Sequence, residues 1–496
     1  MTPYTIYKEL TRKIADVKYA SAVLNWDQET YMPVNGAEMR AQQLSTLSGI
    51  AHELATSDEL GNLLNTLSFD SSLNELQKRN IKTSLKNFNE DKKYTTAFVK
   101  ELSKVISETF QAWQKAKETA DFKLYAPYLE KLVRLKREEC ELLGYTDHPY
   151  DALLDQYEPE TKTADLEILF TDVRQQLVGY IKQLAAKPQN NDSFMFAYFE
   201  KDKQWAVGID LLKQMGFDFD SGRQDLSSHP FTTNFSSKDV RVTTRISEND
   251  FHEMIWSCIH EGGHALYEQG LPISEYGLPS GEYISLGIHE SQSRLWENNV
   301  GRSLSYWKFN YPKLQNIFSD QLKQVTVQDF YKAINVVKPS LIRTSADELT
   351  YHTHVLIRFE IEKALIEGSI HVGELPAIWN KKYKDYLGLD VPNDSLGILQ
   401  DIHWSHGSFG YFPTYSLGSF YAAQFFAQAQ KEIPHLGSQI EGGNLKPLLD
   451  WLREKIHKHG KYYTAEELCV HLTGEKLNFS FFMNYAKEKY NQLYNL

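Results

Sequence analysis

Two histidines and a glutamate at short spacing carry the clearest chemistry in this chain. They stand in the segment Ile259-His-Glu-Gly-Gly-His-Ala265. Residues four apart on a helix share a face, so the imidazoles of His260 and His264 could bind one ion, while Glu261 could act as general base on a metal-bound water. Metal-dependent hydrolysis needs this arrangement. Because so short a motif also arises by chance, the residues around it must support the interpretation.

The surrounding residues predict one helix over 249–269. Apolar side chains recur there at helical spacing, Asp250 offers a helix start, and Gly270 offers a stop. The adjacent Gly262 and Gly263 would each cost a helix about 1 kcal/mol relative to alanine. We therefore expect a close approach of another helix or of the substrate at these glycines, with ordinary helix packing as the simpler alternative.

A third metal ligand is expected downstream, because a catalytic zinc ion keeps three protein ligands and one open position. Glu268 lies one turn beyond His264 on the same helix face. Glu290 falls on the next helix-like segment and could approach from a second element, so we take it as the third ligand. The alternative for Glu290 is a solvated helix charge or an ion pair with Arg294. The remaining candidates are Glu275, Glu282 and Glu297.

A second helix is indicated by a capping box at Ser345-Ala-Asp-Glu348 and a stop at Gly368. Tyr351, His354 and Arg358 are spaced three and four apart on it, so they share one face. A polar face with little charge alternation favours a groove lining that binds substrate. The alternative is an exposed polar face.

Arg343 and an aromatic loop supply further candidate groups. Arginine suits bidentate capture of a carboxylate, although this arginine alone would be unremarkable. The loop over 397–418 is dense in His, Tyr, Trp and Gly, which favours a site lining over a packed aromatic loop. A tyrosine hydroxyl or a histidine from it could stabilise the oxyanion of a tetrahedral intermediate. The candidates are Tyr411, Tyr415, His403 and His406.

The overall pattern predicts a mostly α fold with long helices around a deep groove. Amphipathic helical segments run from residue 5 to about residue 135. The only persuasive strand pattern, over 238–246, lies just before the metal motif and predicts a small β-sheet next to the metal site. The sequence has no internal repeat and no linker long enough to separate independent domains. We therefore expect one catalytic domain over 1–496. Its N-terminal helices, about 1–135, are expected to line or cap the groove.

Composition narrows the function and the compartment. The net charge of -12 disfavours nucleic-acid binding. No apolar run approaches the roughly 18 residues of a membrane span, and the N-terminus is unlike a signal peptide. The three scattered cysteines argue against a disulfide framework and a cysteine metal site. We therefore expect a cytoplasmic protein with no nucleic-acid or membrane partner.

The chain resembles the carboxypeptidase Taq family of metallocarboxypeptidases over nearly its whole length. The resemblance rests on several long motifs in the right order. One departure is Glu160, where the family pattern leads us to expect glycine. The motifs are Trp26 to Pro33, Pro149 to Glu158, His229-Pro-Phe231, Asp239 to Thr243, His289 to Arg294, Ile342 to Tyr351 and Gly397 to Gly418, together with the metal motif.

This resemblance implies a saddle-shaped helical body, usually a homodimer, that releases single residues from peptide C-termini with broad specificity. It implies one divalent metal per chain, with zinc as our choice and cobalt or manganese as alternatives. By motif position, Arg343 would read the free carboxylate, with Tyr411 and His403 near the reacting carbonyl. Asp239 and Arg241 look like groove residues, and His406 matches no family position. The remaining matches are His260, His264 and Glu290 as ligands and Glu261 as base.

Three other functions compete with this one. A helical zinc oligopeptidase or dipeptidase would share the two-histidine helix and a downstream glutamate. A non-catalytic peptide-binding protein could retain a structural metal, although the intact Glu261 argues against it. A helical structural protein with a chance motif would bind no stoichiometric metal.

Overall fold

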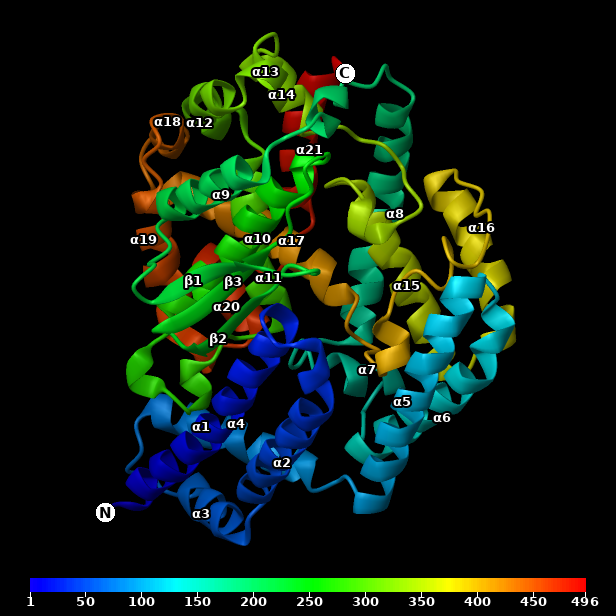
Figure 1. Ribbon diagram of the computed structural model, residues 1–496. Helices are drawn as coiled ribbons and strands as arrows, with labels where there is room; N and C mark the ends of the chain where they lie inside the picture. Colours follow the sequence, from blue (N-terminus) through cyan, green and yellow to red (C-terminus); the bar gives the residue numbers. More distant parts are fainter. The chain divides into compact units, whose positions relative to one another are not determined.

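The computed structural model describes residues 1–496, which form two compact units. Unit 1 contains residues 1–92, 191–334 and 421–477, and unit 2 contains residues 93–190, 335–420 and 478–496. The chain is mostly helical with one three-stranded sheet (Figure 1), which confirms the predicted fold class. No helix is both long enough and apolar enough to cross a membrane.

Unit 1 holds the sheet and most of the helices. Helix α17 (Pro413–Glu432) begins in unit 2 and continues into unit 1. The elements of unit 1 are α1 (Pro3–Thr30), α2 (Ala37–Ala55), α3 (Asp58–Ser68), α4 (Glu75–Asp91), α9 (Lys201–Met215), β1 (Gly222–Leu226), β2 (Thr232–Ser236), β3 (Asp239–Thr244), α10 (Phe251–Gly270), α11 (Leu286–Arg294), a π-helix (Leu295–Gly301), α12 (Leu304–Ile317), α13 (Ser319–Leu322), α14 (Val327–Ala333), α18 (Leu436–Glu441), α19 (Lys446–Lys455) and α20 (Ala465–Thr473).

The sheet has the strand order β1-β3-β2, with β1 parallel and β2 antiparallel to the central β3. Val240, Val242 and Thr244 of β3 are buried, as their alternation predicts. Helix α10 packs on β3 and on the edge strand β2 (Figure 1). The small sheet therefore lies beside the helix that carries the two histidines.

Two glycines allow α10 to be approached closely by its neighbours. A Cβ atom on Gly263 would lie 2.7 Å from the backbone oxygen of Gln292 and 2.7 Å from the Cα atom of Ser293, both in α11. A Cβ atom on Gly262 would lie 2.7 Å from Cδ2 of Leu212 in α9. The expected close helix approach is confirmed, and at Gly263 it is backbone against backbone.

Unit 2 is built around the buried helix α15 (Thr350–Glu367). The predicted stop at Gly368 is confirmed, but the predicted capping box at Ser345 is wrong. Ser345 ends a single 3-10 turn, and the carboxylate of Asp347 instead accepts hydrogen bonds from the amides of Leu349 and Thr350. The other helices of unit 2 are α5 (Thr96–Thr119), α6 (Ala126–Leu143), α7 (Pro149–Leu154), α8 (Thr163–Ala185), α16 (Leu375–Leu387) and α21 (Ser480–Tyr494).

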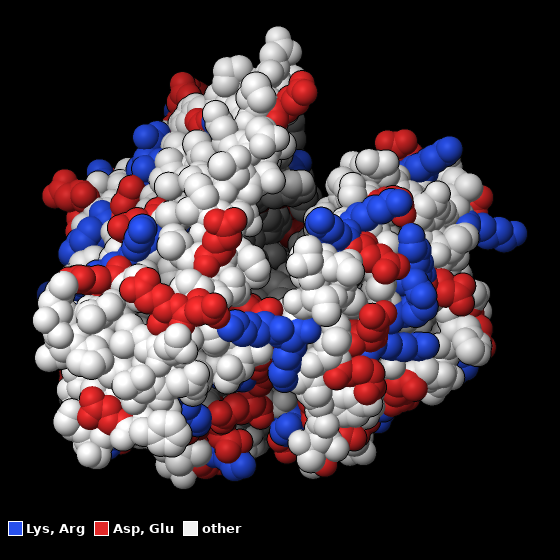
Figure 2. Space-filling view, turned by 90° about the horizontal axis from the view of Figure 1, so that it is seen from below, with Lys and Arg blue, Asp and Glu red and all other residues white.

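Surface charge is mixed in sign. In the space-filling view of Figure 2, basic and acidic side chains are interspersed on the face shown. Neither sign forms one continuous field there. This agrees with a composition of 53 basic and 65 acidic residues.

Candidate metal centre and carboxylate site

Three side chains of unit 1 converge on one point. Single ligand atoms of His260, His264 and Glu290 all lie within 4.8 Å of one another. Oε2 of Glu290 lies 3.5 Å from Nε2 of His260 and 3.3 Å from Nε2 of His264. Helix α10 supplies both rings and α11 supplies the carboxylate, so the site depends on the close packing at Gly263.

These distances suit a first-row divalent ion. Two ligand atoms about 2.0–2.1 Å from a zinc ion at the tetrahedral angle are separated by about 3.3 Å. The two separations from Glu290 have this size. Two imidazole nitrogens and one carboxylate oxygen form a donor set that zinc, cobalt and manganese all accept. The residues present therefore fit the metal that the sequence implies.

The second nitrogen of each histidine ring also has a partner. Nδ1 of His260 lies 2.8 Å from Oε2 of Glu297, and Nδ1 of His264 lies 3.1 Å from the backbone oxygen of His289. Such partners hold Nδ1 in the N–H form and leave Nε2 as the free acceptor. Both rings are thus oriented with Nε2 toward Glu290.

Two arginines and a serine orient the acidic partners. Nε of Arg294 donates to Oε1 of Glu290 over 2.7 Å, and the Ser293 hydroxyl donates to Oε2 over 3.0 Å. Arg294 and Arg302 also donate to Glu297. Burial would raise the pKa of Glu290, but Arg294, His260 and His264 outweigh it and hold that pKa well below its usual range. Glu290 is therefore ionised. Its Oε1 pairs with Arg294, while its Oε2 faces the two histidine rings.

Glu261 points to a different neighbour. The Thr232 hydroxyl of the edge strand β2 donates to its Oε2 over 2.7 Å. Burial raises the pKa of Glu261, although His260 and this hydroxyl act against the shift. A carboxylate with a raised pKa accepts protons more readily than an exposed one, as a general base must.

The other candidate glutamates have partners away from this point. Glu268 pairs with the His289 ring over 2.7 Å and accepts a hydrogen bond from the Asn234 amide. Glu275 accepts from the Ser280 hydroxyl, and Glu282 lies 3.7 Å from Lys461. Glu297 contacts His260 on the side of the ring away from Glu290. The sequence offered Glu297 only as another candidate ligand, and nothing in it indicated a contact with Nδ1 of His260.

In unit 2, Arg343 is buried and held by two side chains. Its Nε donates to Oδ1 of Asp401 over 2.9 Å, and its Nη1 donates to the Tyr351 hydroxyl over 3.0 Å. The guanidinium also lies 5.0 Å from the ring centre of Tyr415 and 5.5 Å from that of Phe412. Aromatic rings and one partly buried carboxylate therefore hold the Arg343 guanidinium, which the sequence analysis had singled out without its partners. Asp401 was missed, although it stands two residues before His403 in the aromatic loop.

The other two predicted residues of α15 lie deeper. Arg358 is fully buried and donates from Nε to Oδ2 of Asp401 over 2.7 Å. His354 is also fully buried, and its Nδ1 lies 2.9 Å from the Tyr383 hydroxyl. The alternative of an exposed polar face is excluded, because Tyr351 is buried too. Arg343 and Arg358 therefore donate to different oxygens of the Asp401 carboxylate.

The aromatic loop brings its candidates together in unit 2. Nε2 of His403 lies 3.1 Å from the Tyr415 hydroxyl, and the rings of His403 and Tyr411 are 5.4 Å apart. Burial and the nearby charge of Arg343 lower the pKa of His403 to about 3, so this ring is neutral. His406 is exposed, and its ring packs at a tilt against Phe110, which separates it from this group.

Asp239 and Arg241 pair with each other on β3 in unit 1. Both guanidinium contacts to the carboxylate are 3.0 Å long. Arg241 also lies 4.2 Å from the ring centre of Trp26 in α1 and 4.8 Å from that of Phe235. The pair thus joins the sheet to the first helix of the chain.

Known proteins resemble this chain over its full length. The sequence profile of the carboxypeptidase Taq (M32) metallopeptidase family matches residues 6–490. Carboxypeptidase 1 of Bacillus subtilis is 41% identical over 491 residues, which cover 98% of each chain. Thermostable carboxypeptidase 1 of Thermus thermophilus is 37% identical and is covered completely. The crystal structure of an M32 carboxypeptidase from Deinococcus radiodurans R1 is 36% identical, covers 100% of each chain and has a TM-score of 0.98.

Proposed function

The chain belongs to the carboxypeptidase Taq (M32) family of metallopeptidases, and we propose that it releases single amino acids from the free C-termini of peptides with broad side-chain tolerance. It is a metallocarboxypeptidase, and therefore a hydrolase of peptide bonds. The observation that carries the proposed chemistry is the convergence of His260, His264 and Glu290 within 4.8 Å.

These three residues are proposed to hold one divalent ion per chain, with zinc as the resident metal. Cobalt and manganese are the alternatives, because the same donor set accepts them. When bound, such an ion polarises the scissile carbonyl and makes water a stronger acid. Glu297 and the backbone oxygen of His289 keep the two Nε2 atoms available for it.

Glu261 is proposed as the general base. The Thr232 hydroxyl occupies Oε2 and so leaves Oε1 to take a proton from the attacking water. The same oxygen can then deliver the proton to the leaving amine. Burial supports this role, because it raises the pKa of the carboxyl and makes the anion a better proton acceptor.

Arg343 is proposed to bind the free carboxylate of the substrate. Asp401 and Tyr351 hold its guanidinium by Nε and Nη1, so the side chain is already ordered before a peptide binds. Arg358 supports this arrangement from the other oxygen of Asp401. Tyr415 is also proposed to bind the substrate. His354, which is fully buried, is proposed to belong to the substrate-binding set through its contact with the Tyr383 hydroxyl.

Tyr411 and His403 are proposed to stabilise the oxyanion. The lowered pKa of His403, about 3, makes it a neutral N–H donor at physiological pH. Asp239 and Arg241 are proposed as further substrate-binding residues, supported by their place in a family motif on β3.

We also propose a homodimer that acts in the cytoplasm on peptides. The homodimer is supported by the family resemblance alone. The compartment is supported by three buried cysteines that form no disulfide. A single catalytic domain that includes both compact units is also proposed, supported by the family match over residues 6–490.

Mass spectrometry of a mixed peptide pool tests the reaction. We expect ladders that shorten from the C-terminus by one residue at a time, and no ladders after a chelator has removed the metal. Internal cuts would indicate an oligopeptidase instead. Unchanged peptides with a metal-loaded protein would indicate a binding function.

A further inference from the structure

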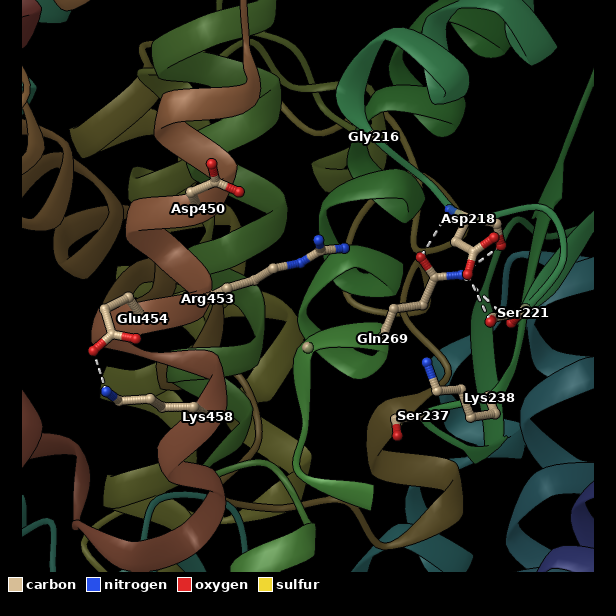
Figure 3. Close-up of a pocket in the computed structure, with 11 residues that line it drawn as sticks. Gly216, Asp218, Ser221, Ser237, Lys238, Gln269, Asp450, Arg453, Glu454 and Lys458 are labelled. Carbon is tan, nitrogen blue, oxygen red and sulfur yellow. Dashed lines mark hydrogen bonds and ion pairs between the residues drawn. The ribbon is translucent and has the colours of Figure 1, made fainter. Parts of the chain in front are cut away.

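A pocket in unit 1 lies apart from every residue assigned above. Its volume is about 650 Å³, within the range of small-molecule sites. It is open to solvent and is lined by the turn after α9, the turn between β2 and β3, the last residues of α10, and the region around the end of α19 (Figure 3). The lining residues that matter below are Asp218, Lys238, Gln269, Asp450, Arg453 and Glu454.

The acidic residues of the pocket already have partners. Asp218 accepts from the Ser221 hydroxyl over 2.7 Å and from the amide of Asp220 over 3.0 Å. Asp450 accepts from the Lys446 amine, and Glu454 pairs with Lys458. Asp450 and Glu454 are therefore each paired with a lysine of their own segment, whereas the donors to Asp218 are neutral groups and the charge of Lys238 acts on this carboxylate.

Two cations of the pocket form no direct ion pair. Arg453 forms no ion pair, and its Nε is buried without a hydrogen-bond partner. Its guanidinium extends from α19 across the pocket toward Gln269 (Figure 3). Lys238 forms no ion pair either, and its amine points into the same space from the β2–β3 turn (Figure 3). The Nη atoms at the end of the Arg453 guanidinium form no hydrogen bond, so they are available to donate to an anionic ligand in the pocket.

The walls around these cations are fixed before any ligand binds. Gln269 accepts from the amide of Asp218 over 3.0 Å and donates to its backbone oxygen over 2.8 Å. Gly270 packs directly on the His457 ring, where a Cβ atom would lie 2.5 Å from Nδ1. Nε2 of His457 in turn lies 3.0 Å from Oε1 of Gln292 in α11. The pocket is thus built onto α10 and, through His457, onto the helix that carries Glu290.

We propose that this pocket binds a small metabolite carrying a carboxylate or phosphate group, with Arg453 and Lys238 as the residues that bind the anion. Arg453 presents its planar fork, which suits either oxyanion, and Lys238 adds a point charge. The pocket is a second ligand site, and its occupancy does not depend on the catalytic assignment.

Isothermal titration of the metal-loaded protein tests the site. The probes are inorganic phosphate and succinate, each compared with sodium chloride at matched ionic strength. We expect saturable binding of at least one probe at one molecule per chain. Binding of phosphate alone identifies a phosphorylated ligand, and binding of succinate alone identifies a carboxylate.

Two variants locate the binding in this pocket. Arg453→Met and Lys238→Met should each weaken it, by about tenfold or more for the arginine, since each removes a charge-assisted donor. Lys238 is exposed on a turn, so its substitution leaves the fold intact even if Arg453→Met lowers the Tm. Lys455→Met is the matched control, because it removes a cation of α19 that pairs with Glu432 outside the pocket.

A further control separates this pocket from the carboxylate site. Arg343→Lys should keep the probe binding that Arg453→Met and Lys238→Met weaken. The proposal is overturned if neither probe binds above chloride. It is equally overturned if both Arg453→Met and Lys238→Met bind like the unmodified protein.

Discussion

Nδ1 of His260 lies 2.8 Å from Oε2 of Glu297, on the side of the ring opposite the Nε2 that faces Glu290. This contact fixes both the tautomer and the angle of the ring. Arg294 and Arg302 hold Glu297 in turn, and despite its burial they and His260 keep its pKa well below the usual range. A charged carboxylate therefore contacts the proposed metal ligand His260 on the side of its ring opposite Glu290.

Replacing this carboxylate should weaken metal binding without removing a ligand. We expect Glu297→Gln to lower zinc affinity by about 10–100-fold, because the ring loses its charged hydrogen-bond partner. Competition with a chromophoric chelator measures the change. Glu282→Gln is the control, since that carboxylate is about half exposed and lies 3.7 Å from its nearest cation. Equal affinities in the two variants would show that Glu297 does not support the site.

Removing the proposed base should separate metal binding from catalysis. Glu261→Gln keeps both imidazoles and Glu290, so we expect full metal content by elemental analysis. Turnover should fall by about 10²–10⁴-fold, the usual contribution of a general base. A normal kcat in Glu261→Gln would rule out Glu261 as the base. Loss of the metal in this variant would also contradict the prediction, because the loss of turnover would then follow from the missing metal.

The packing at Gly263 should tolerate no side chain. A methyl group there would meet the backbone of Gln292 and Ser293 at 2.7 Å, and backbone moves less readily than a side-chain tip. We expect Gly263→Ala to lower the free energy of unfolding by about 1–3 kcal/mol, the usual cost of overpacking. Because α11 must move, zinc affinity should fall as well.

Gly179→Ala is the matched control for this substitution. Gly179 lies inside α8, and nothing would come within 4 Å of its added Cβ atom. Alanine should raise stability there by about 0.4–1 kcal/mol. Thermal unfolding of both variants gives the comparison, and equal Tm values would contradict the account of the Gly263 contact.

Local chemistry in the sequence predicted which residues of the candidate metal site lie close together. The spacing of His260 and His264 placed both rings on one helix face, and a carboxylate oxygen of Glu290 lies within 4.8 Å of a nitrogen of each ring. Its role as a ligand stays a prediction. The supporting contacts of Glu297 and Thr232 were not predictable in the same way. Each of these contacts joins α10 to a separate element, the π-helix for Glu297 and β2 for Thr232, and residue spacing does not predict which elements pack together.

Two backbone details also show how far local sequence predicts structure. Glu160 has φ +69, a left-handed conformation that favours glycine, so the departure from the family pattern coincides with strained backbone. The start of α15 was misplaced because Ser345 and Asp347 both offer plausible caps, and only the turn at Arg343–Ser345 decides between them. Arg343 was found by its residue type, but its partner Asp401 comes from a segment 58 residues away.

Glu362 in α15 should make stability depend on pH. Burial raises its pKa to about 7, even though Tyr150, Gly410 and Trp404 donate hydrogen bonds to it. The folded protein therefore holds this proton more tightly than the unfolded chain, whose value is near 4.5. The stabilisation is complete below pH 4.5 and is lost as the pH rises to about 7, at up to about 1.4 kcal/mol per pH unit.

Thermal unfolding of Glu362→Gln checks this dependence. Glutamine cannot ionise, so the variant does not lose stability as the pH rises through the pKa of Glu362, whereas the unmodified protein does. We expect the Tm of the unmodified protein to fall relative to the Tm of Glu362→Gln as the pH rises from 5 to 8. A Tm of the unmodified protein that stays constant or rises relative to the variant over this range would contradict a raised pKa for Glu362.

The central claim is that Arg343 reads a free C-terminus for a metal-dependent hydrolysis. The most direct measurement compares kcat/KM for one peptide in its free-acid and C-terminally amidated forms, with the unmodified enzyme and with Arg343→Lys. We expect the unmodified enzyme to cleave only the free acid. In Arg343→Lys, kcat/KM for that peptide should fall by about 10–100-fold, because lysine keeps the charge but loses the held guanidinium fork. Equal turnover of both peptide forms by the unmodified enzyme, or an unchanged kcat/KM in Arg343→Lys, would contradict the claim.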